Sequence, residues 1–313
     1  MANSPMMETT DQNDVRAAIA GHLVGREREL ELLYAAVSAG RDVLLEGPPG
    51  TSKTTMLKAI TAEWGIPLVL VEGNADLTPA KLVGHHSPAR VMREGYTADN
   101  FIDGPLVEAM RQGGFLYMEE FNRAPEDTLN VLLMAIGDRS IAIPNVGDVR
   151  AAENFRVIGS MNPYDNVGTR RLSTSIHDRF CRSTIGYQDG EAEEGIVSLR
   201  TPELAADAFT RRLIGDGVAA TRATRAHEDV RQGSSVRGAI DLVKVGAELG
   251  RLRGAGAGDE DREAYLKLLL DAMLMALSGR IQVHEAAQRA PEQILTEIWE
   301  DLFILRPAPV GPG

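Results

Sequence analysis

The stretch that decides the fold is Gly47-Pro48-Pro49-Gly50-Thr51-Ser52-Lys53-Thr54. It follows a short apolar run over residues 42–46, which predicts a strand, and precedes a helical pattern over about residues 53–63. Glycines let backbone N–H groups turn inward around phosphates, and the N-terminus of the next helix adds partial positive charge. Lys53 supplies a cation for the β- and γ-phosphates, and Thr54 supplies a hydroxyl for Mg²⁺. This order of strand, loop and helix predicts a P-loop that binds ATP and Mg²⁺.

The loop departs from the usual P-loop pattern at one position, because Ser52 stands where the motif has glycine before the lysine. Its small side chain must point away from the phosphates for the loop to close. The alternative interpretation is an ordinary Gly-Pro turn, which would leave the Lys53-Thr54 pair and its strand–helix context to coincidence.

Apolar strands alternate with helices through the first half of the chain, which predicts an α/β fold. Parallel strands need helical crossovers, so we expect a parallel sheet with helices on both faces. A hairpin is expected around residues 145–148, after a helix that begins at residue 125 and ends at Gly137. The predicted strands span residues 42–46, 67–71, 115–118 and 155–161, and the other predicted helices span residues 27–39 and 104–112.

After about residue 188 the pattern becomes helical only, which predicts a second, small all-helical domain. The expected organisation is a flexible arm over residues 1–22, the α/β domain over 23–188, the helical domain over 195–305 and a frayed tail over 306–313.

Two carboxylates, Glu119 and Glu120, directly follow the apolar run over residues 115–118. This matches a Walker B pattern, in which the first carboxylate, together with Thr54, holds Mg²⁺ and the second polarises the attacking water. Aspartate is usual at the first position, and Glu119 is one methylene longer. The alternative is a solvated strand end, although a P-loop about 65 residues upstream favours the catalytic interpretation.

Composition narrows the classes of function. The 313 residues carry a net charge of −12, which argues against non-specific binding to nucleic acid, and they include one cysteine, which suits a reducing compartment. No uninterrupted apolar run is long enough to span a membrane. We therefore expect a cytoplasmic protein with no membrane partner. The adjacent pair His85-His86 indicates a polar loop rather than a metal site, because no further ligand stands at a suitable spacing.

The segment Leu116-Tyr117-Met118-Glu119-Glu120-Phe121-Asn122-Arg123-Ala124-Pro125 resembles the Walker B signature of the MoxR-type branch of AAA+ ATPases. Further matches to that branch occur over residues 129–136, 160–163 and 177–180, and the resemblance covers roughly residues 23–250. It implies a P-loop AAA+ module followed by a helical lid.

The resemblance also implies roles for individual residues. Asn162 would be sensor 1, which positions the lytic water beside Glu120. Arg179 would be an arginine finger that reaches the nucleotide of a neighbouring subunit, with Arg170 and Arg171 as rival candidates.

Two further sites follow from the same resemblance. Arg237, at the start of a lid helix, would be sensor 2 and contact the nucleotide. Val24-Gly25 would lie beside the adenine, although a glycine turn before an amphipathic helix is a simpler explanation.

By resemblance, the protein would be an ATP-hydrolysing ring, a hexamer, that remodels a protein client, in some cases with a partner that carries a von Willebrand factor A domain. An insertion over residues 77–103 and the hairpin around 145–148 would contact the client, with Tyr96 and Phe101 as either client contacts or local packing. Two alternatives stay open: a nucleic-acid motor or loader, which the negative charge disfavours, and a nucleotide-gated scaffold with little turnover.

Overall fold

The structure, a computed structural model, describes residues 23–163, 172–204, 207–254 and 262–305. The expected N-terminal arm and C-terminal tail, as well as Arg170 and Arg171, lie outside the described residues. The chain forms two compact units, Met1–Gly186 and Tyr187–Gly313.

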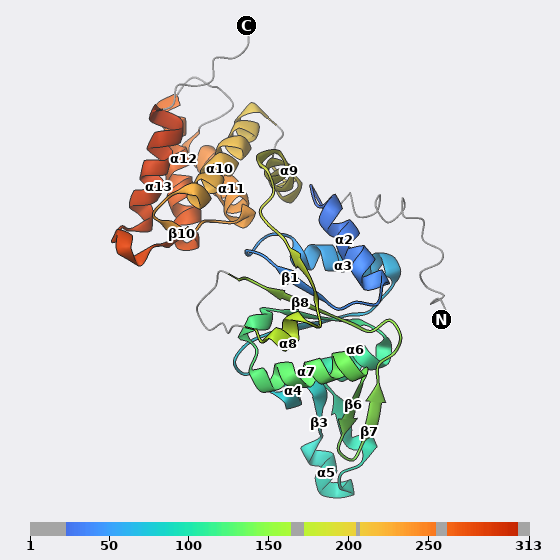
Figure 1. The fold of residues 1–313 in the computed structure, drawn as a ribbon. Coiled ribbons are helices and arrows are strands. Elements are labelled where there is room, and N and C mark those ends of the chain that lie inside the picture. Colours follow the sequence, from blue (N-terminus) through green and yellow to red (C-terminus); the bar gives the residue numbers. More distant parts are fainter. Residues whose placement is uncertain (1–22, 164–171, 205–206, 255–261, 306–313) are drawn as a thin grey trace. The chain divides into compact units, whose positions relative to one another are not determined.

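The first unit is built on a five-stranded parallel sheet in the order β2-β5-β8-β1-β9 (Figure 1). Its strands are β1 (Val43–Glu46), β2 (Leu68–Glu72), β5 (Phe115–Glu119), β8 (Arg156–Met161) and β9 (Cys181–Thr184). β8 is hydrogen-bonded to both β5 and β1, with Met118 opposite Gly159 and Glu46 opposite Met161. The carboxyl ends of β5, β8 and β1 therefore meet at one edge of the sheet.

Helices cover both faces of this sheet, as the alternation in the sequence predicted. Successive side chains of a strand point to opposite faces. Val43, Leu45, Phe115 and Tyr117 accordingly pack with α2 (Glu27–Ser38) and α3 (Lys53–Trp64). Leu44, Leu116 and Met118 pack on the other side with α6 (Pro105–Gln112) and α7 (Glu126–Asp138). These two apolar layers thus fix which side chains of β5 face α3.

The end of α7 differs from the expectation that Gly137 would terminate it. The helix continues to Asp138, and Arg139 adopts the left-handed conformation with φ 52°. The Arg139 guanidinium donates hydrogen bonds to the carbonyl oxygens of Phe155 (2.7 Å) and Ala152 (3.0 Å). These tertiary hydrogen bonds place the helix end one residue beyond the glycine.

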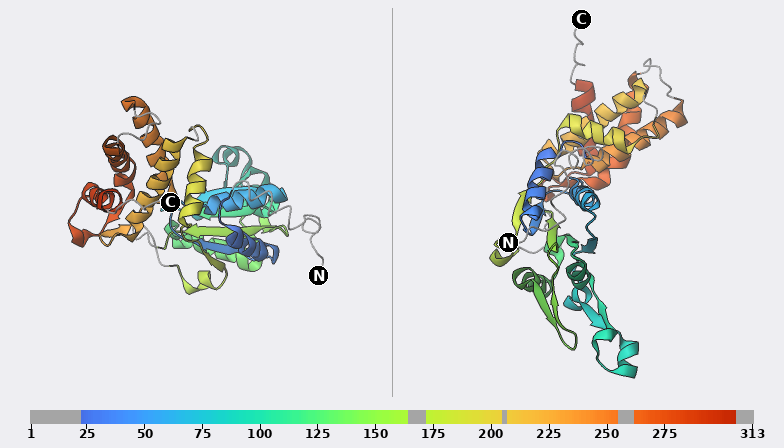
Figure 2. Two further views of the ribbon diagram at one scale, coloured as in Figure 1. Left: turned by 90° about the horizontal axis from the view of Figure 1, so that it is seen from above. Right: turned by 90° about the vertical axis from the view of Figure 1, so that its right-hand side faces the viewer.

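Two segments extend from the same end of the first unit (Figures 1 and 2). One is the predicted hairpin, formed by β6 (Ser140–Ile143) and β7 (Gly147–Arg150). The other is the insertion, which contains α4 (Pro79–Val83), the antiparallel pair β3 (Gly84–His86) and β4 (Phe101–Asp103), and α5 (Pro88–Glu94) between them. α6 packs against strands of both segments, so they share one support.

The second unit is helical, as predicted, and has its own apolar core. A small antiparallel pair, β10 (Val230–Gln232) and β11 (Gln282–Val283), adds two strands that the sequence pattern did not show. α9 begins this unit at Gly190, before the expected start at residue 195. The helices are α9 (Gly190–Arg200), α10 (Ala208–Ala226), α11 (Val236–Arg253), α12 (Arg262–Leu277) and α13 (Pro291–Trp299), followed by a π-helix over Glu300–Leu305. Among the described residues, no helix has both the length and the apolar composition to cross a membrane.

Candidate nucleotide-binding site

The loop between β1 and α3 is held tightly by its neighbours. The Gly47 N–H donates to the Met161 carbonyl oxygen at 3.1 Å. On its other side, a Cβ at position 47 would lie 2.0 Å from the Ile185 carbonyl oxygen. Gly50 has φ 75°, a conformation that glycine adopts without steric cost. The loop geometry therefore requires glycine at position 47, and glycine at position 50 avoids the steric cost of a left-handed residue.

Lys53 closes the loop from inside. Its Nζ donates to the carbonyl oxygens of Gly47 and Pro48, both at 2.8 Å, and the Thr51 hydroxyl donates to the Pro48 carbonyl at 2.9 Å. The chain from residue 47 to residue 51 thus curves around the lysine ammonium group. A cation held within a curved backbone at a helix N-terminus suits the phosphates of a nucleotide.

Ser52 occupies the position where the motif has glycine, and its backbone shows why. It is left-handed, with φ 67° and ψ 16°, and its side chain makes no capping hydrogen bond to α3. A residue with a Cβ pays about 1–2 kcal/mol for this conformation. The backbone at position 52 thus has a conformation that glycine adopts without steric cost, and the serine that stands there is strained.

The expected metal-binding pair is in contact. Thr54, in the first turn of α3, donates its hydroxyl proton to Oε1 of Glu119, the last residue of β5. A hydroxyl and a carboxylate are hard oxygen ligands, which Mg²⁺ prefers, and Mg²⁺ keeps several waters rather than requiring a full protein cage. Within the described parts of the chain, no group of three or more His, Cys, Asp or Glu side chains could enclose a metal ion. The residues present therefore fit Mg²⁺ bound with phosphate.

A buried tyrosine adjoins this pair. The Tyr117 hydroxyl oxygen lies 3.3 Å from Thr54 Oγ1, and the same hydroxyl donates to Ser160 Oγ at 2.9 Å. Burial raises the pKa of Tyr117 to about 12, so the phenol is protonated at neutral pH. The phenol is therefore an uncharged neighbour of the Thr54 hydroxyl.

Glu120 adopts an unusual backbone conformation at the end of β5. It has φ 50° and ψ 44°, and its carboxylate lies 3.3 Å from Nε of Arg123. Left-handed non-glycine residues cluster at functional sites, because the strain persists only where the surroundings impose it. Two of the five such residues in the described parts of the chain, Ser52 and Glu120, belong to this site.

Gly73 is a site residue that the sequence analysis missed. It follows β2 directly, and its N–H donates to the Glu119 carbonyl oxygen at 2.7 Å. A Cβ here would lie 2.4 Å from the Glu120 carbonyl oxygen. Only glycine allows the end of β2 to approach the acidic pair so closely. A glycine directly after an apolar strand was the available signal, although such glycines are common in turns.

Asn162 directly follows β8 and therefore lies between the strand ends that carry Glu119 and Gly47. It is largely buried, and the Asn122 amide donates to its backbone carbonyl at 3.4 Å. The structure thus brings the P-loop, the acidic pair and Asn162 to adjacent strand ends.

Arg179 lies at the other end of the strands, beside the amino end of β1 rather than its carboxyl end. It precedes β9, whose first residue, Cys181, pairs with Val43 at the amino end of β1. It lines a pocket of ≈ 540 Å³ that also includes Gly40 and Asp42, which precede β1. At about 3.3 Å per residue, β1 separates this edge from the P-loop by about 10 Å. Arg179 is therefore not part of the site formed by its own chain.

The remaining expected residues lie in two places. Arg237 is the exposed second residue of α11, in the second unit. Val24 and Gly25 precede α2 in the first unit, and Gly25 has φ 64°. The buried Arg26 fixes this segment by donating to Glu29 Oε1 and to the Gly186 carbonyl oxygen, each at 2.7 Å.

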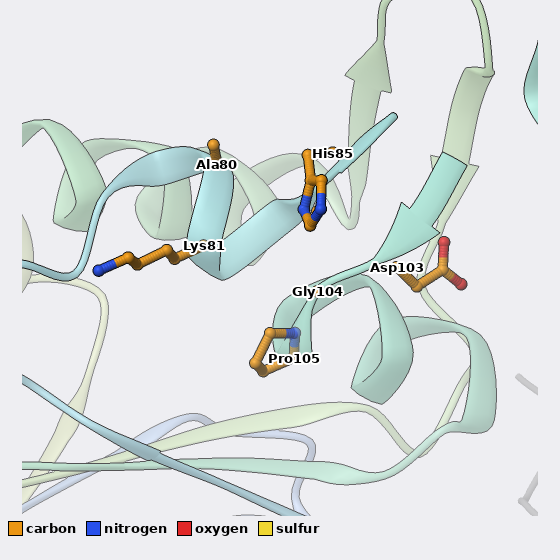
Figure 3. A pocket seen from close by; sticks show the side chains of 7 residues that line it. Ala80, Lys81, His85, Asp103, Gly104 and Pro105 are labelled. Carbon is orange, nitrogen blue, oxygen red and sulfur yellow. The ribbon is translucent and has the colours of Figure 1, made fainter. Parts of the chain in front are cut away.

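A separate pocket of ≈ 320 Å³ opens at the base of the insertion (Figure 3). It is lined by Lys81, His85 and Asp103, with small residues between them. The pocket contains no nucleotide-site residue. His85 is exposed, and the neighbouring His86 ring packs edge-on against the rings of Tyr96 and Phe101 at 5.2 Å. Both aromatic rings therefore contribute to local packing, and Tyr96 remains 65% exposed.

Comparisons with known proteins identify the family of the chain. A family model described as "AAA domain (dynein-related subfamily)" matches residues 42–180, a span that contains the P-loop, the acidic pair, Asn162 and Arg179. YojN, an uncharacterized protein of Bacillus subtilis (strain 168), is 30% identical over 253 residues, which cover 76% of this chain and 81% of YojN. The chain belongs to the MoxR-type branch of the AAA+ family.

Other relatives extend this AAA+ assignment. The gas vesicle ATPase GvpN of Ancylobacter aquaticus is 28% identical over 253 residues, which cover 76% of this chain and 68% of GvpN. The solved structure of a RuvB mutant from Thermotoga maritima matches with a TM-score of 0.53 and 19% identity, over 81% of this chain and 71% of that one. At this identity, the likeness to RuvB shows the fold alone. The chain is thus an AAA+ module with a helical C-terminal region.

Proposed function

We propose that this AAA+ protein hydrolyses ATP and uses the reaction to remodel a protein partner. The observation that carries the proposal is the meeting of the Thr54–Glu119 pair, Glu120 and Asn162 on adjacent strand ends beside the P-loop. A module that only senses nucleotide needs no acidic residue beyond its metal-binding pair, and this chain holds Glu120 in a strained conformation at that place.

The roles follow from the positions. Loop N–H groups and Lys53 would bind the phosphates, and Thr54 and Glu119 would hold Mg²⁺, which when bound supplies positive charge that stabilises the phosphates in the reaction. Glu120 orients a water molecule and takes its proton as the water oxygen bonds to the γ-phosphorus and the bond to the β–γ bridging oxygen breaks. Asn162 holds the same water. Arg237 would contact the nucleotide from the lid, and Val24-Gly25 would border the adenine.

We propose further that the active site is shared between subunits of a ring, a hexamer. Arg179 is exposed at the edge of the sheet opposite the P-loop, which suits a residue that serves the nucleotide of a neighbouring copy. AAA+ proteins commonly assemble as rings, and a heterologous contact between the P-loop of one copy and the Arg179 of the next forms a ring where the rotation between copies closes.

The insertion and the hairpin are the proposed contacts for a protein client. Met92 and Tyr96, in and just after α5, expose 89% and 65% of their surface. The relative named as a gas vesicle ATPase favours a protein assembly as the target. We propose further that a partner with a von Willebrand factor A domain acts with the ring. We also propose a cytoplasmic location, because a reducing compartment suits the single, exposed Cys181.

Two substitutions, each with a matched control, test the catalytic part. Glu120→Gln should bind ATP with wild-type affinity and lose turnover by at least about a hundredfold. Glu126→Gln, on an exposed residue of the same segment, is the matched control and should remain active. Lys53→Ala should lose nucleotide binding, whereas Lys58→Ala, exposed on the same helix, should retain it. Undiminished hydrolysis by Glu120→Gln would remove that residue from the mechanism, and a wild type that binds ATP without turnover would favour the scaffold alternative.

Mixing variants tests the shared site. Arg179→Ala should bind ATP and fail to hydrolyse it. Adding Glu120→Gln subunits should restore part of the activity, because the intact Arg179 of one copy would complete the site that carries the intact Glu120 of the other. Absence of rescue in mixtures shown to co-assemble would refute the role of Arg179 between subunits.

A further inference from the structure

Tyr117 is a polar residue in an apolar position. It lies in the interior of β5, between Leu116 and Met118, and exposes only 1% of its surface. Its ring packs with Met56 and Leu57 of α3 in one continuous apolar cluster. A phenylalanine would fill the same volume without burying a hydroxyl, whose desolvation costs free energy unless hydrogen bonds replace its water contacts. The hydroxyl therefore needs an explanation beyond packing.

The hydroxyl is directed at the site. Tyr117 precedes Glu119 by two residues in one strand, so both side chains point to the face that α3 covers. Its oxygen lies 3.3 Å from Thr54 Oγ1, and its proton goes to Ser160 Oγ at 2.9 Å. Ser160 is itself buried in β8, two residues before Asn162. A row of hydroxyls thus runs from β8 through β5 to the first turn of α3.

Thr54 needs such a neighbour if it is to bind a metal ion. A hydroxyl that coordinates a cation turns a lone pair toward it and must direct its proton to another acceptor. The Thr54 proton has two acceptors within reach, Glu119 Oε1 and the Tyr117 oxygen. When the Glu119 carboxylate interacts with a metal ion and its waters, it is less available to accept the Thr54 proton. The phenol oxygen of Tyr117 then remains as the second acceptor for the Thr54 hydroxyl.

We propose that Tyr117 is a positioning residue for the metal site: its hydroxyl, braced by Ser160, holds Thr54 in the rotamer that presents its oxygen to Mg²⁺. This inference rests on the proposed binding of Mg²⁺ and ATP. The phenol contacts neither the nucleotide nor the reacting atoms, so its effect passes through Thr54.

The test is the Mg²⁺ dependence of nucleotide binding in Tyr117→Phe, which removes one oxygen and keeps the packed ring. A fluorescent, non-hydrolysable ATP analogue is titrated at increasing Mg²⁺ and, separately, in excess EDTA. The Mg²⁺ concentration for half-maximal binding should rise about three- to tenfold, the size of one neutral hydrogen bond. Affinity in EDTA should stay at the wild-type value. Ser160→Ala should shift the Mg²⁺ dependence in the same direction by a smaller factor.

Tyr265→Phe is the matched control, because Tyr265 is also buried and donates to Asp216 Oδ2 at 2.7 Å, but in the second unit. It should lose thermal stability without changing the Mg²⁺ dependence. An unchanged Mg²⁺ dependence in Tyr117→Phe, or an equal loss of affinity in EDTA, would overturn the inference and leave the proposed function standing. A wild-type protein that binds no nucleotide with or without Mg²⁺ would refute both.

Discussion

Substituting Ser52 with glycine should stabilise the first unit without changing its affinity for nucleotide. Ser52 is left-handed, with φ 67° and ψ 16°. Removing its Cβ relieves about 1–2 kcal/mol of steric cost. Glycine also increases the conformational entropy of the unfolded chain, which lowers the free energy of unfolding by about 0.5–1 kcal/mol. The net gain is about 0–1.5 kcal/mol with a midpoint near 0.75 kcal/mol, which at the midpoint is roughly 1.5–3 °C in the melting temperature of a unit of this size.

The assay is thermal unfolding together with ATP affinity. A left-handed turn shared by the free and the nucleotide-bound loop is stabilised equally in both, so the affinity for ATP should stay within about twofold. Ser52→Ala keeps the Cβ and should give no increase in melting temperature. The reasoning is refuted if Ser52→Gly lowers the melting temperature, or if Ser52→Ala raises it equally. A large gain in affinity would show instead that the turn forms only with nucleotide.

Two other predictions concern the ends of the sheet. Gly73→Ala should reduce ATP turnover by at least about tenfold, because its Cβ would lie 2.4 Å from the Glu120 carbonyl oxygen and displace the acidic pair. Gly279→Ala, whose Cβ would meet no atom within 4 Å, should be neutral in the same steady-state assay, and equal activities of the two variants would contradict this account. Burial raises the pKa of Asp42 above its usual value of 3.8, so its contribution to stability is complete below that pH and is lost as the pH rises through the folded-state pKa. Asp42→Asn keeps an oxygen that accepts from the Val157 N–H but carries no charge. In urea titrations, the free energy of unfolding of this variant relative to wild type should therefore rise from about pH 4 to about pH 7. A constant difference would argue against a buried, desolvated carboxylate.

The fold was predictable where the signals were local. A few neighbouring residues were enough to predict β1, β5 and β8, which are short apolar runs, and the P-loop, which is marked by its glycines. β9 was missed because Cys181–Thr184 is polar and largely exposed, and it becomes a strand only through its pairing with β1. The three-residue strands β3 and β4 have no periodicity to detect and depend on each other.

The site was predictable as a set of motifs and less so as a geometry. Glu119, Glu120 and Asn162 follow apolar strands, so their meeting at one edge of the sheet follows from parallel pairing. The close approach of Gly73 and the contact between Tyr117 and Thr54 join residues 46 to 63 positions apart, which no local pattern encodes. The position of Arg179 at the opposite edge likewise depends on β9, the strand that the sequence did not show.

In the proposed mechanism, a neighbouring copy of the chain completes each ATPase site. The steady-state ATPase rate per subunit, measured as a function of protein concentration at fixed ATP and Mg²⁺ with the assembly mass in parallel, tests this directly. A shared site should give a specific rate that rises as a ring forms, and no such rise for Arg179→Ala. A specific rate that is independent of concentration across the transition from monomer to ring would contradict it.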